Sequence, residues 1–492
     1  MRRLFPQLLA GLLLASSCVP ARAFSLLGAY DAWMTPEVGL NLPFDIGGSM
    51  NLGEEYRWTI PVITYGFDES FLNYFGTKGV EEIEKAISVF NNLPPFSKMS
   101  ADLSEFPLDT RRFNHRARAL VLHDLRSFAM ASLLEVLGVG PAERFAWQIR
   151  SRAVINNIPL YAVTKRNFDP VTFEPTAYVN GTLYTYLILQ TWTIPAYEAV
   201  EFEVDPTRPT VSSLSGFNVG GGTIGSSGYL TSFEPGLFYT GLTRDDVGAL
   251  RYIYRAQNVN VETLPPGVVG APLNSGGSGL IGSGQNTSSP WGIPPSLATN
   301  LTTLFTNLTT TVTNGAAVSQ ALRPGIDKLV FTRVDFDSFT GGWVTLTNRY
   351  EDMFITNSTL VRQLVDRPLA GPDVLFSAAD LGVIAATGEP FVYFRNVNWL
   401  SQDAINGTQA LSGPGVINPQ TTMTFTKLGQ WLFNVGDGGQ ADALDDFWWG
   451  SFDGTTNAPV VYPSGASIKA LENLILSGQA DRLGFSSPWS SP

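Results

Sequence analysis

The spacing of hydrophobic positions in the first half of the chain predicts a mixture of helices and strands. Alternating β-branched and aromatic residues over 56–67 predict a strand. Apolar residues at three- and four-residue steps then predict helices over 79–92 and 116–137, and a third helix from Pro141. The chain therefore begins its folded part with one strand followed by a helical group.

Beyond these helices the hydrophobic period changes to two residues, which is typical of strands. Asn180-Gly181 lies between apolar and aromatic flanks and predicts a hairpin, because both turn positions need a positive φ. The segment 199–206 is a further strand candidate. Thr243 and Asp246 have the spacing of a helix start, and apolar residues follow them at helical steps. A helix from Thr243 therefore closes the first block.

The second half of the chain contains short strand-like runs separated by turn residues. Over about 322–463 no long amphipathic helix interrupts them, so we predict an antiparallel sandwich or an open barrel. A run rich in Gly, Ser and Thr separates the two blocks and favours a flexible connector. The expected fold class is α+β. We expect an α+β domain at 24–264, a linker at 265–320, an all-β, sandwich-like domain at 321–466, and a short helix with a tail at 467–492.

The N-terminal segment has the order of a secretory signal. Two arginines precede an apolar run, and Ala21-Arg22-Ala23 supplies the small residues of a cleavage site. We expect residues 1–23 to be removed after Ala23 and the mature chain to be secreted or held at the cell surface. The one cysteine, Cys18, would leave with the signal, which favours a bacterial source; lipidation at Cys18 is the alternative. No later stretch reaches the roughly 18 apolar residues of a spanning helix.

Charge and composition narrow the classes of partner. The formal net charge of -12 disfavours nucleic acid, because binding to phosphate backbones depends on basic side chains that displace counterions. Charged residues make up only 15% of the chain and aromatic residues 12%, a balance that favours packed sheets over disorder. The remaining partner classes are a glycan, another protein, or further copies of this chain.

Both ends of the first block resemble a known family. Trp58-Thr59-Ile60 and Ile63-Thr64-Tyr65 stand before the first predicted helix. Gly241 to Val247, with Tyr252-Ile253-Tyr254 behind it, stands at the close. Over about residues 55–255 the chain resembles matrixin-type metzincins. The resemblance implies a zincin-like α+β domain, which here would carry β-rich insertions.

The resemblance also implies where a zinc site would lie. In that family the active helix reads H-E-x-x-H-x-x-G-x-x-H, with three histidines on zinc. Laid on this chain from His123, the glutamate position holds Asp124, the second histidine position Ser127, the glycine position Met130 and the third histidine position Leu133. His115 is about 12 Å from His123 along a helix and cannot join it on one ion. We therefore expect the zinc motif to be degenerate and the protein to hold no catalytic zinc.

Other chemistry depends on carboxylates, because G-x-S-x-G does not occur in the sequence. Asp335 with Asp337, or Asp445 with Asp446, could form the acid and base of a glycoside hydrolase, although aspartates in turns usually cap them. Calcium is the candidate cofactor. Its candidate ligands lie on one glycine-containing loop: Asp437, Asp442, Asp445 and Asp446.

Aromatic residues gather near the end of the second block. Trp431, Trp448 and Trp449 could present indole rings to a sugar or a partner protein. Packing in a core is the alternative and the commoner role of such residues. The candidate surface therefore depends on whether these rings are exposed.

Three functions remain at the level of the sequence, and the sequence leaves open whether the chain is an enzyme. The leading hypothesis is an exported, non-catalytic binding or structural protein built on a zincin-like domain that lacks its zinc ligands. The first alternative is a secreted, carboxylate-dependent hydrolase that acts on polysaccharide. The second alternative is a subunit of a cell-surface layer or filament.

Overall fold

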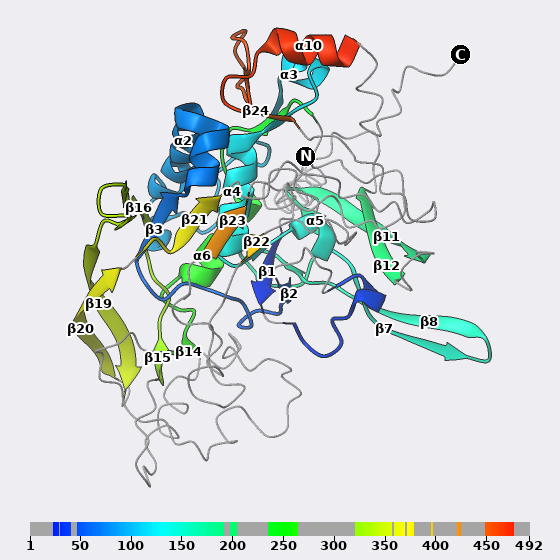
Figure 1. Ribbon diagram of the computed structural model, residues 1–492. Helices are drawn as coiled ribbons and strands as arrows, with labels where there is room; N and C mark the ends of the chain where they lie inside the picture. Colours follow the sequence, from blue (N-terminus) through cyan, green and yellow to red (C-terminus); the bar gives the residue numbers. More distant parts are fainter. Residues whose placement is uncertain are drawn as a thin grey trace, which may run out of the picture.

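The computed structural model shows a mixture of few helices and many small sheets (Figure 1). It describes residues 23–28, 30–40, 47–190, 197–203, 235–263, 320–356, 359–369, 371–377, 395–396, 421–424 and 448–476. Within these ranges no sheet closes into a barrel. All of the predicted signal segment except Ala23, and nearly all of the predicted linker, lie outside the described residues.

One helix and one mixed sheet form the framework of the molecule. Helix α2 (Glu69–Asn91) starts at Asp68, whose carboxylate accepts the Phe71 N–H, and it is kinked at Gly76, where φ is 60°. It covers and extends the helix expected at 79–92, which is confirmed. The sheet contains β3 (Val62–Phe67), β16 (Val330–Arg333), β21 (Val374–Ser377), β22 (Arg395–Asn396) and β23 (Thr421–Thr424). Their order is β16–β3–β21–β23–β22, and only the β22–β23 pairing is antiparallel.

Strands from both sides of the predicted linker share sheets, so a separate all-β sandwich is not confirmed. Strand β3 pairs with β16 on one side and with β21 on the other. A second sheet joins strands from both blocks in the order β14–β15–β19–β20: β14 (Asn260–Thr263), β15 (Gln320–Arg323), β19 (Leu346–Thr356) and β20 (Thr359–Leu369). The domain boundaries themselves stay a prediction.

Buried charged side chains reinforce this junction between the two blocks. The Arg57 guanidinium donates to the Arg323 carbonyl at 2.8 Å, and Arg323 in turn forms an ion pair with Asp352. The Asp373 carboxylate accepts the Thr64 N–H and hydroxyl, both at 2.8 Å. Each of these five side chains is buried. Because a buried charge is tolerated only when it is paired or hydrogen-bonded, these contacts fix how the strands of the two blocks are placed.

The helix expected at 116–137 is wrong as a single element. The chain forms α3 (His115–Ala119), then β5 (Leu122–Asp124) and then α4 (Leu125–Val136). Val121 interrupts the helix with φ of 55°, and β5 pairs in parallel with β24 (Trp448–Ser451). The apolar stripe spans the break although Leu122 and Leu125 are buried in different clusters, so the period alone did not reveal it.

The helix expected from Pro141 is also shorter than predicted. Helix α5 (Ala142–Phe145) is a single turn, and the chain continues as a two-stranded ribbon of β7 (Gln148–Ile155) and β8 (Ile158–Thr164). Asn156 and Asn157 form its turn, with φ of 52° and 62°. Two positive φ values in a two-residue turn suit the twist of a hairpin, and asparagine tolerates them better than most residues.

The other hairpin and the closing helix are confirmed. Strands β10 (Tyr178–Val179) and β11 (Thr182–Gln190) flank Asn180-Gly181, and β12 (Tyr197–Glu203) covers most of the strand expected at 199–206. Helix α6 (Arg244–Tyr254) starts at Thr243 with the full capping box to Asp246. The predicted C-terminal helix is α10 (Ile468–Leu476).

The remaining elements are short. They are β1 (Phe24–Gly28), η1 (Pro36–Val38), β2 (Gly48–Ser49), η2 (Phe96–Lys98), β4 (Arg111–Phe113), β6 (Val139–Gly140), β9 (Asn167–Phe168), β13 (Leu237–Tyr239), β17 (Phe336–Asp337), β18 (Gly342–Trp343) and β25 (Val460–Val461). None of the helices in the described ranges has the length and apolar character needed to cross a membrane.

Helices α4 and α6 are central to the core. The Trp58 indole donates to the Val136 carbonyl at 3.0 Å, and the Tyr254 hydroxyl donates to the Leu137 carbonyl at 2.9 Å. Both side chains are fully buried, and their bonds satisfy carbonyls at the C-terminal end of α4 that lack helical partners. Leu133, one of the degenerate motif positions, lies in this core and is not exposed at all.

Candidate functional site

The residues that align with a zinc motif lie at the junction of β5 and α4. His123 and Asp124 belong to the strand, where they pair with Trp449 and Gly450 of β24. Ser127 is the third residue of the helix. The motif H-E-x-x-H places both histidines on one face of a helix, so a histidine on a strand before the helix departs from that geometry. Both the local backbone and the side chains therefore differ from those of the active helix in that family.

Asp124 acts as the N-cap of α4. Its Oδ2 accepts the Ser127 N–H at 2.8 Å and the Ser127 hydroxyl at 2.6 Å. The Ser127 oxygen in turn accepts the Tyr239 N–H at 2.8 Å, which ties α4 to β13. A carboxylate at a helix N-terminus satisfies N–H groups that have no helical partner and interacts favourably with the helix dipole. Thus the residue at the aligned glutamate position caps α4, and the residue at the aligned position of the second histidine links α4 to β13.

Burial shifts the titration of both acidic and basic groups here. Desolvation raises the pKa of Asp124 from its ordinary value of 3.8 to about 7, opposed by the two hydrogen bonds from Ser127 and assisted by the negative charge of Glu82. Desolvation also lowers the pKa of His123 to about 3, so its imidazole is neutral at pH 7. His123 and Asp124 are each 1% exposed and Ser127 is not exposed. A substrate in solution cannot reach these side chains.

No ion-binding group accompanies His123 among the described residues. Within those ranges, no three His, Cys, Asp or Glu side chains lie together so that they could hold a metal ion. His115 is the first residue of α3, on a separate element from His123. The calcium candidates Asp437, Asp442, Asp445 and Asp446 lie outside the described residues and stay a prediction, as does the Asp445/Asp446 pair.

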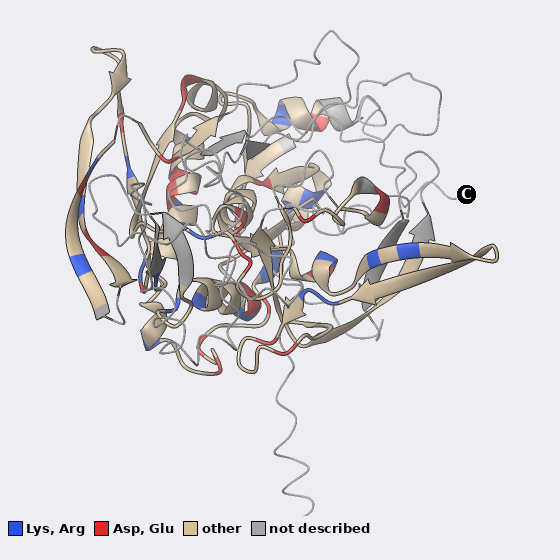
Figure 2. Ribbon diagram, turned by 90° about the horizontal axis from the view of Figure 1, so that it is seen from below, with Lys and Arg blue, Asp and Glu red and all other residues tan. Residues whose placement is uncertain are grey.

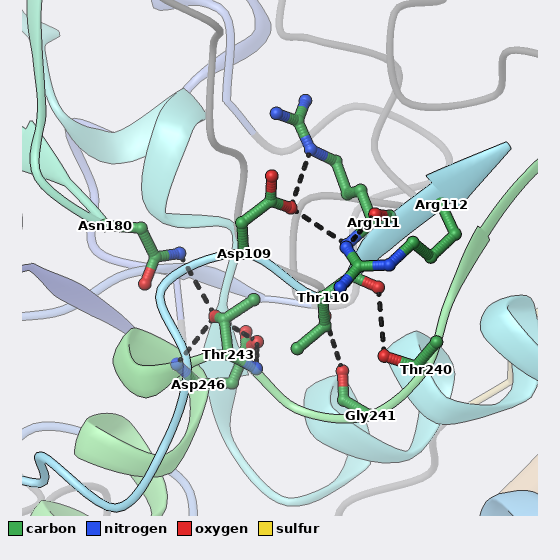
Figure 3. Close-up of polar contacts among 9 residues, drawn as sticks. All are labelled: Asp109, Thr110, Arg111, Arg112, Asn180, Thr240, Gly241, Thr243 and Asp246. Atoms are coloured by element: carbon green, nitrogen blue, oxygen red, sulfur yellow. Dashed lines mark hydrogen bonds and ion pairs between the residues drawn. The ribbon is translucent and has the colours of Figure 1, made fainter.

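A second buried polar junction surrounds the N-terminus of α6 (Figure 3). The Thr243 hydroxyl and N–H both contact the Asp246 carboxylate, at 2.5 and 2.8 Å, and the Asn180 side-chain amide donates to the Thr243 hydroxyl oxygen at 3.1 Å. Thr110 donates to the Gly241 carbonyl at 2.7 Å, which connects this junction to the segment leading into β4. These contacts link the hairpin turn, the closing helix and an edge strand.

Sequence reasoning missed the role of Asp245 in this junction. Its Oδ2 accepts the Ala23 N–H at 3.0 Å and the Asn180 N–H at 2.5 Å, and the residue is 1% exposed. Burial raises its pKa well above the ordinary value. The acidic first turn of α6 was visible in the sequence, but nothing local indicated that Asp245 would be buried as well as the capping Asp246.

The first carboxylate pair does not resemble an acid and a base. Asp335 accepts from the Arg333 guanidinium at 2.7 Å, with a side chain that is 68% exposed. Asp337 accepts the Phe339 N–H at 2.8 Å, and this bond lowers its pKa. A catalytic pair needs one carboxyl whose pKa is raised so that it stays protonated. Asp337 is held ionised as a turn cap, and the polysaccharide hydrolase stays an untested prediction.

Burial removes one of the three candidate tryptophans, Trp449, from the predicted ligand surface. Trp449 is not exposed and packs edge-on against Phe128, with ring centroids 4.9 Å apart. It is therefore a core residue at the β5–β24 pairing and does not present its ring to a ligand. Trp448 belongs to the same strand by its backbone, and Trp431 lies outside the described residues.

Exposed apolar residues occur instead on the ribbon of β7 and β8, which sequence reasoning took in part for a helix. Residues 151–160 are all exposed. The two-residue Asn156-Asn157 turn between β-branched residues could have revealed this hairpin.

Comparison of the chain with protein-family models, with curated proteins and with solved structures finds no match.

Proposed function

We propose that this chain is an exported, non-catalytic protein that works by binding or as a structural element outside the cytoplasm, on a zincin-like domain without zinc. The observation that carries the proposal is the use made of the aligned motif positions. Asp124 caps a helix, Ser127 ties that helix to β13, and Leu133 fills the core. All three side chains contribute to hydrogen bonding or packing within the fold, and none is accessible to a substrate.

The proposal is supported by the electrostatics of the same positions. A zinc peptidase needs an open coordination position and a glutamate that polarises the metal-bound water. Here the carboxyl at that position is hydrogen-bonded to Ser127 in a dry environment, and burial favours its protonated form up to about pH 7. A protonated carboxyl cannot serve as the general base.

Metal analysis of the purified mature chain tests the proposal. We expect less than stoichiometric zinc, and no cleavage of casein that a chelator abolishes. Stoichiometric zinc together with chelator-sensitive cleavage would overturn it. Turnover of a polysaccharide that is lost in Asp337→Asn would also overturn it, in favour of the carboxylate hydrolase, whereas glycan binding without turnover supports the binding role.

A further inference from the structure

The ribbon of β7 and β8 projects from the rest of the molecule (Figure 1). No side chain of residues 151–160 is buried. Its large apolar side chains are exposed by about half or more: Val154 (53%), Ile155 (56%), Ile158 (61%) and Leu160 (51%). A two-stranded ribbon is only marginally stable alone in water, and contiguous exposed apolar residues mark interaction sites. The ribbon therefore has the properties of a docking element.

One face of this ribbon carries no charge. Residues paired across two strands lie on the same face, and successive pairs alternate between faces. The uncharged face carries three pairs: Ile155 with Ile158, Ala153 with Leu160, and Ser151 with Ala162. The opposite face carries two pairs: Val154 with Pro159, and Arg152 with Tyr161. The apolar residues of the uncharged face thus form a continuous strip next to the turn, while Val154 and Pro159 lie on the opposite face.

The charges of the ribbon are all positive. Residues 148–166 contain Arg150, Arg152, Lys165 and Arg166 and no acidic residue, in a chain whose net charge is -12. Figure 2 shows blue positions and no red ones along the projecting ribbon. Near its base, the Arg150 guanidinium lies 4.2 Å from the centroid of the Trp33 ring, and the Lys165 ammonium lies 4.8 Å from that of Trp147. The partner of this element should therefore be both anionic and able to accept apolar side chains.

We propose that the ribbon docks on the surface of an anionic phospholipid bilayer. The uncharged face lies against the boundary of the acyl region, about 5–10 Å deep as in other interfacial elements, and Arg152 on the opposite face lies among the headgroups. The amides of Asn156 and Asn157 stay among the headgroups because the ribbon lies on its face. This inference names the partner class for the proposed binding function and rests on it.

A second copy of the chain fits the ribbon less well. A stable dimer buries about 800 Å² on each partner, more than a few ribbon side chains supply. Two ribbons stacked on one another would also bring the basic residues of one copy near those of the other, and residues 148–166 contain no acidic residue. Anionic headgroups compensate these charges, and each basic residue near such a surface strengthens binding about fivefold.

Co-sedimentation of the mature chain with vesicles tests the inference. The vesicles consist of phosphatidylcholine alone or of phosphatidylcholine mixed with phosphatidylglycerol. The apolar variant is Ile155→Ser with Ile158→Ser. Its matched control is Leu360→Ser with Leu364→Ser, which removes two similarly exposed residues (45% and 69%) from β20. The charge variant is Arg152→Gln, with Arg362→Gln on β20 as its control.

We expect the wild-type chain to sediment with the anionic vesicles and to be released by high salt. The partition coefficient should fall about tenfold or more in the apolar variant and about fivefold in Arg152→Gln, while both controls stay within about twofold of wild type. Equal binding to neutral vesicles, no vesicle binding, or equal losses in the controls would overturn the inference. So would a lipid-free dimer, seen by sedimentation velocity, that dissociates in the apolar variant.

Circular dichroism and the melting temperature of each variant establish that the fold is retained, which the exposure of all substituted residues predicts. The outcome is separate from the test of the proposed function. Hydrolytic turnover would overturn that function whatever the vesicles show, and a failure to bind vesicles would leave it standing while removing this partner.

Discussion

Replacing Asp124 with asparagine should change how the stability of the protein depends on pH. The new side chain keeps an oxygen that can accept the Ser127 N–H, and asparagine is as good an N-cap as aspartate. The substitution removes the ionisable group. Because Asp124 is 1% exposed, asparagine closely resembles the protonated form of the native side chain. The variant therefore isolates the free energy of ionising one buried carboxyl.

The size of the effect follows from the pKa of Asp124 in the two states. Burial raises this pKa from 3.8 to about 7, so the native state binds the proton more tightly than the unfolded chain does. The stability that results is complete below the unfolded value and is lost as the pH rises through the native value. At about 1.4 kcal/mol per pKa unit, roughly 3 kcal/mol is lost between about pH 5 and about pH 9. The asparagine variant does not incur this loss.

Urea unfolding of both proteins at the two pH values measures the effect. Asp124→Asn should be about 2 kcal/mol more stable than wild type at the lower pH, which already lies above the unfolded pKa, and gain about 3 kcal/mol more relative to wild type on going to the higher pH. Asp453→Asn is the control, because Asp453 is exposed and hydrogen bonds to Thr455 lower its pKa, so it is ionised throughout. A difference between wild type and Asp124→Asn that is independent of pH would refute the burial of this carboxyl.

Three further predictions test the packing and hydrogen bonding of the fold. Gly138→Ala should destabilise the protein by at least about 2 kcal/mol, because φ is +94° and the new Cβ would overlap the Tyr56 carbonyl oxygen. Gly241→Ala, in open space, should stay within about 0.5 kcal/mol of wild type. Equal melting temperatures of the two variants would contradict this prediction. Trp449→Ala should cost about 3–5 kcal/mol in urea unfolding if its ring is core, whereas a loss below about 1 kcal/mol would show that it is surface. Asp245→Ala should cost about 1–3 kcal/mol by leaving the buried Asn180 N–H without its acceptor, and Asp245→Asn, which retains an acceptor, should restore most of it; equal losses in both variants would argue against this bond.

Local signals in the sequence predicted the elements whose formation depends on neighbouring residues. The capping pair Thr243 and Asp246 marked the start of α6, and Asn180-Gly181 marked a hairpin, because these side chains act on backbone groups within three residues. The amphipathic pattern after residue 79 marked α2 because the buried positions of a helix recur every three to four residues. All three signals can be read without knowing which other elements the helix or turn contacts.

Pairings between distant segments could not be predicted in this way. Strand β5 exists because it pairs with β24 near the other end of the chain, and its three residues otherwise fit the apolar stripe of a helix. Strand β3 lies between β16 and β21, which come from the predicted second domain. Hydrophobic period gives the face that is buried but does not identify the strand that covers it.

Part of the candidate site could be predicted from the spacing of its residues in the sequence. Asp124 and Ser127 are three residues apart ahead of an apolar run, which is the spacing of an N-cap and the N–H it binds. The helix expected over 116–137 included both residues, whereas the capping signature predicts a helix start between Asp124 and Leu125. The burial of His123, in contrast, follows from the β5–β24 pairing and has no local signal.

Two departures from the usual distribution of side chains bear on function, and only the first has a reason in the fold. Carboxyl groups are buried at Asp124 and Asp245, and each is compensated by hydrogen bonds that start a helix or join elements. Aliphatic side chains are exposed along the outer β7–β8 ribbon, where they contribute no buried area to the core. Departures from local rules that the fold does not compensate are expected at functional sites. The buried carboxyl groups thus stabilise the fold, and the exposed aliphatic surface of the β7–β8 ribbon is available for binding.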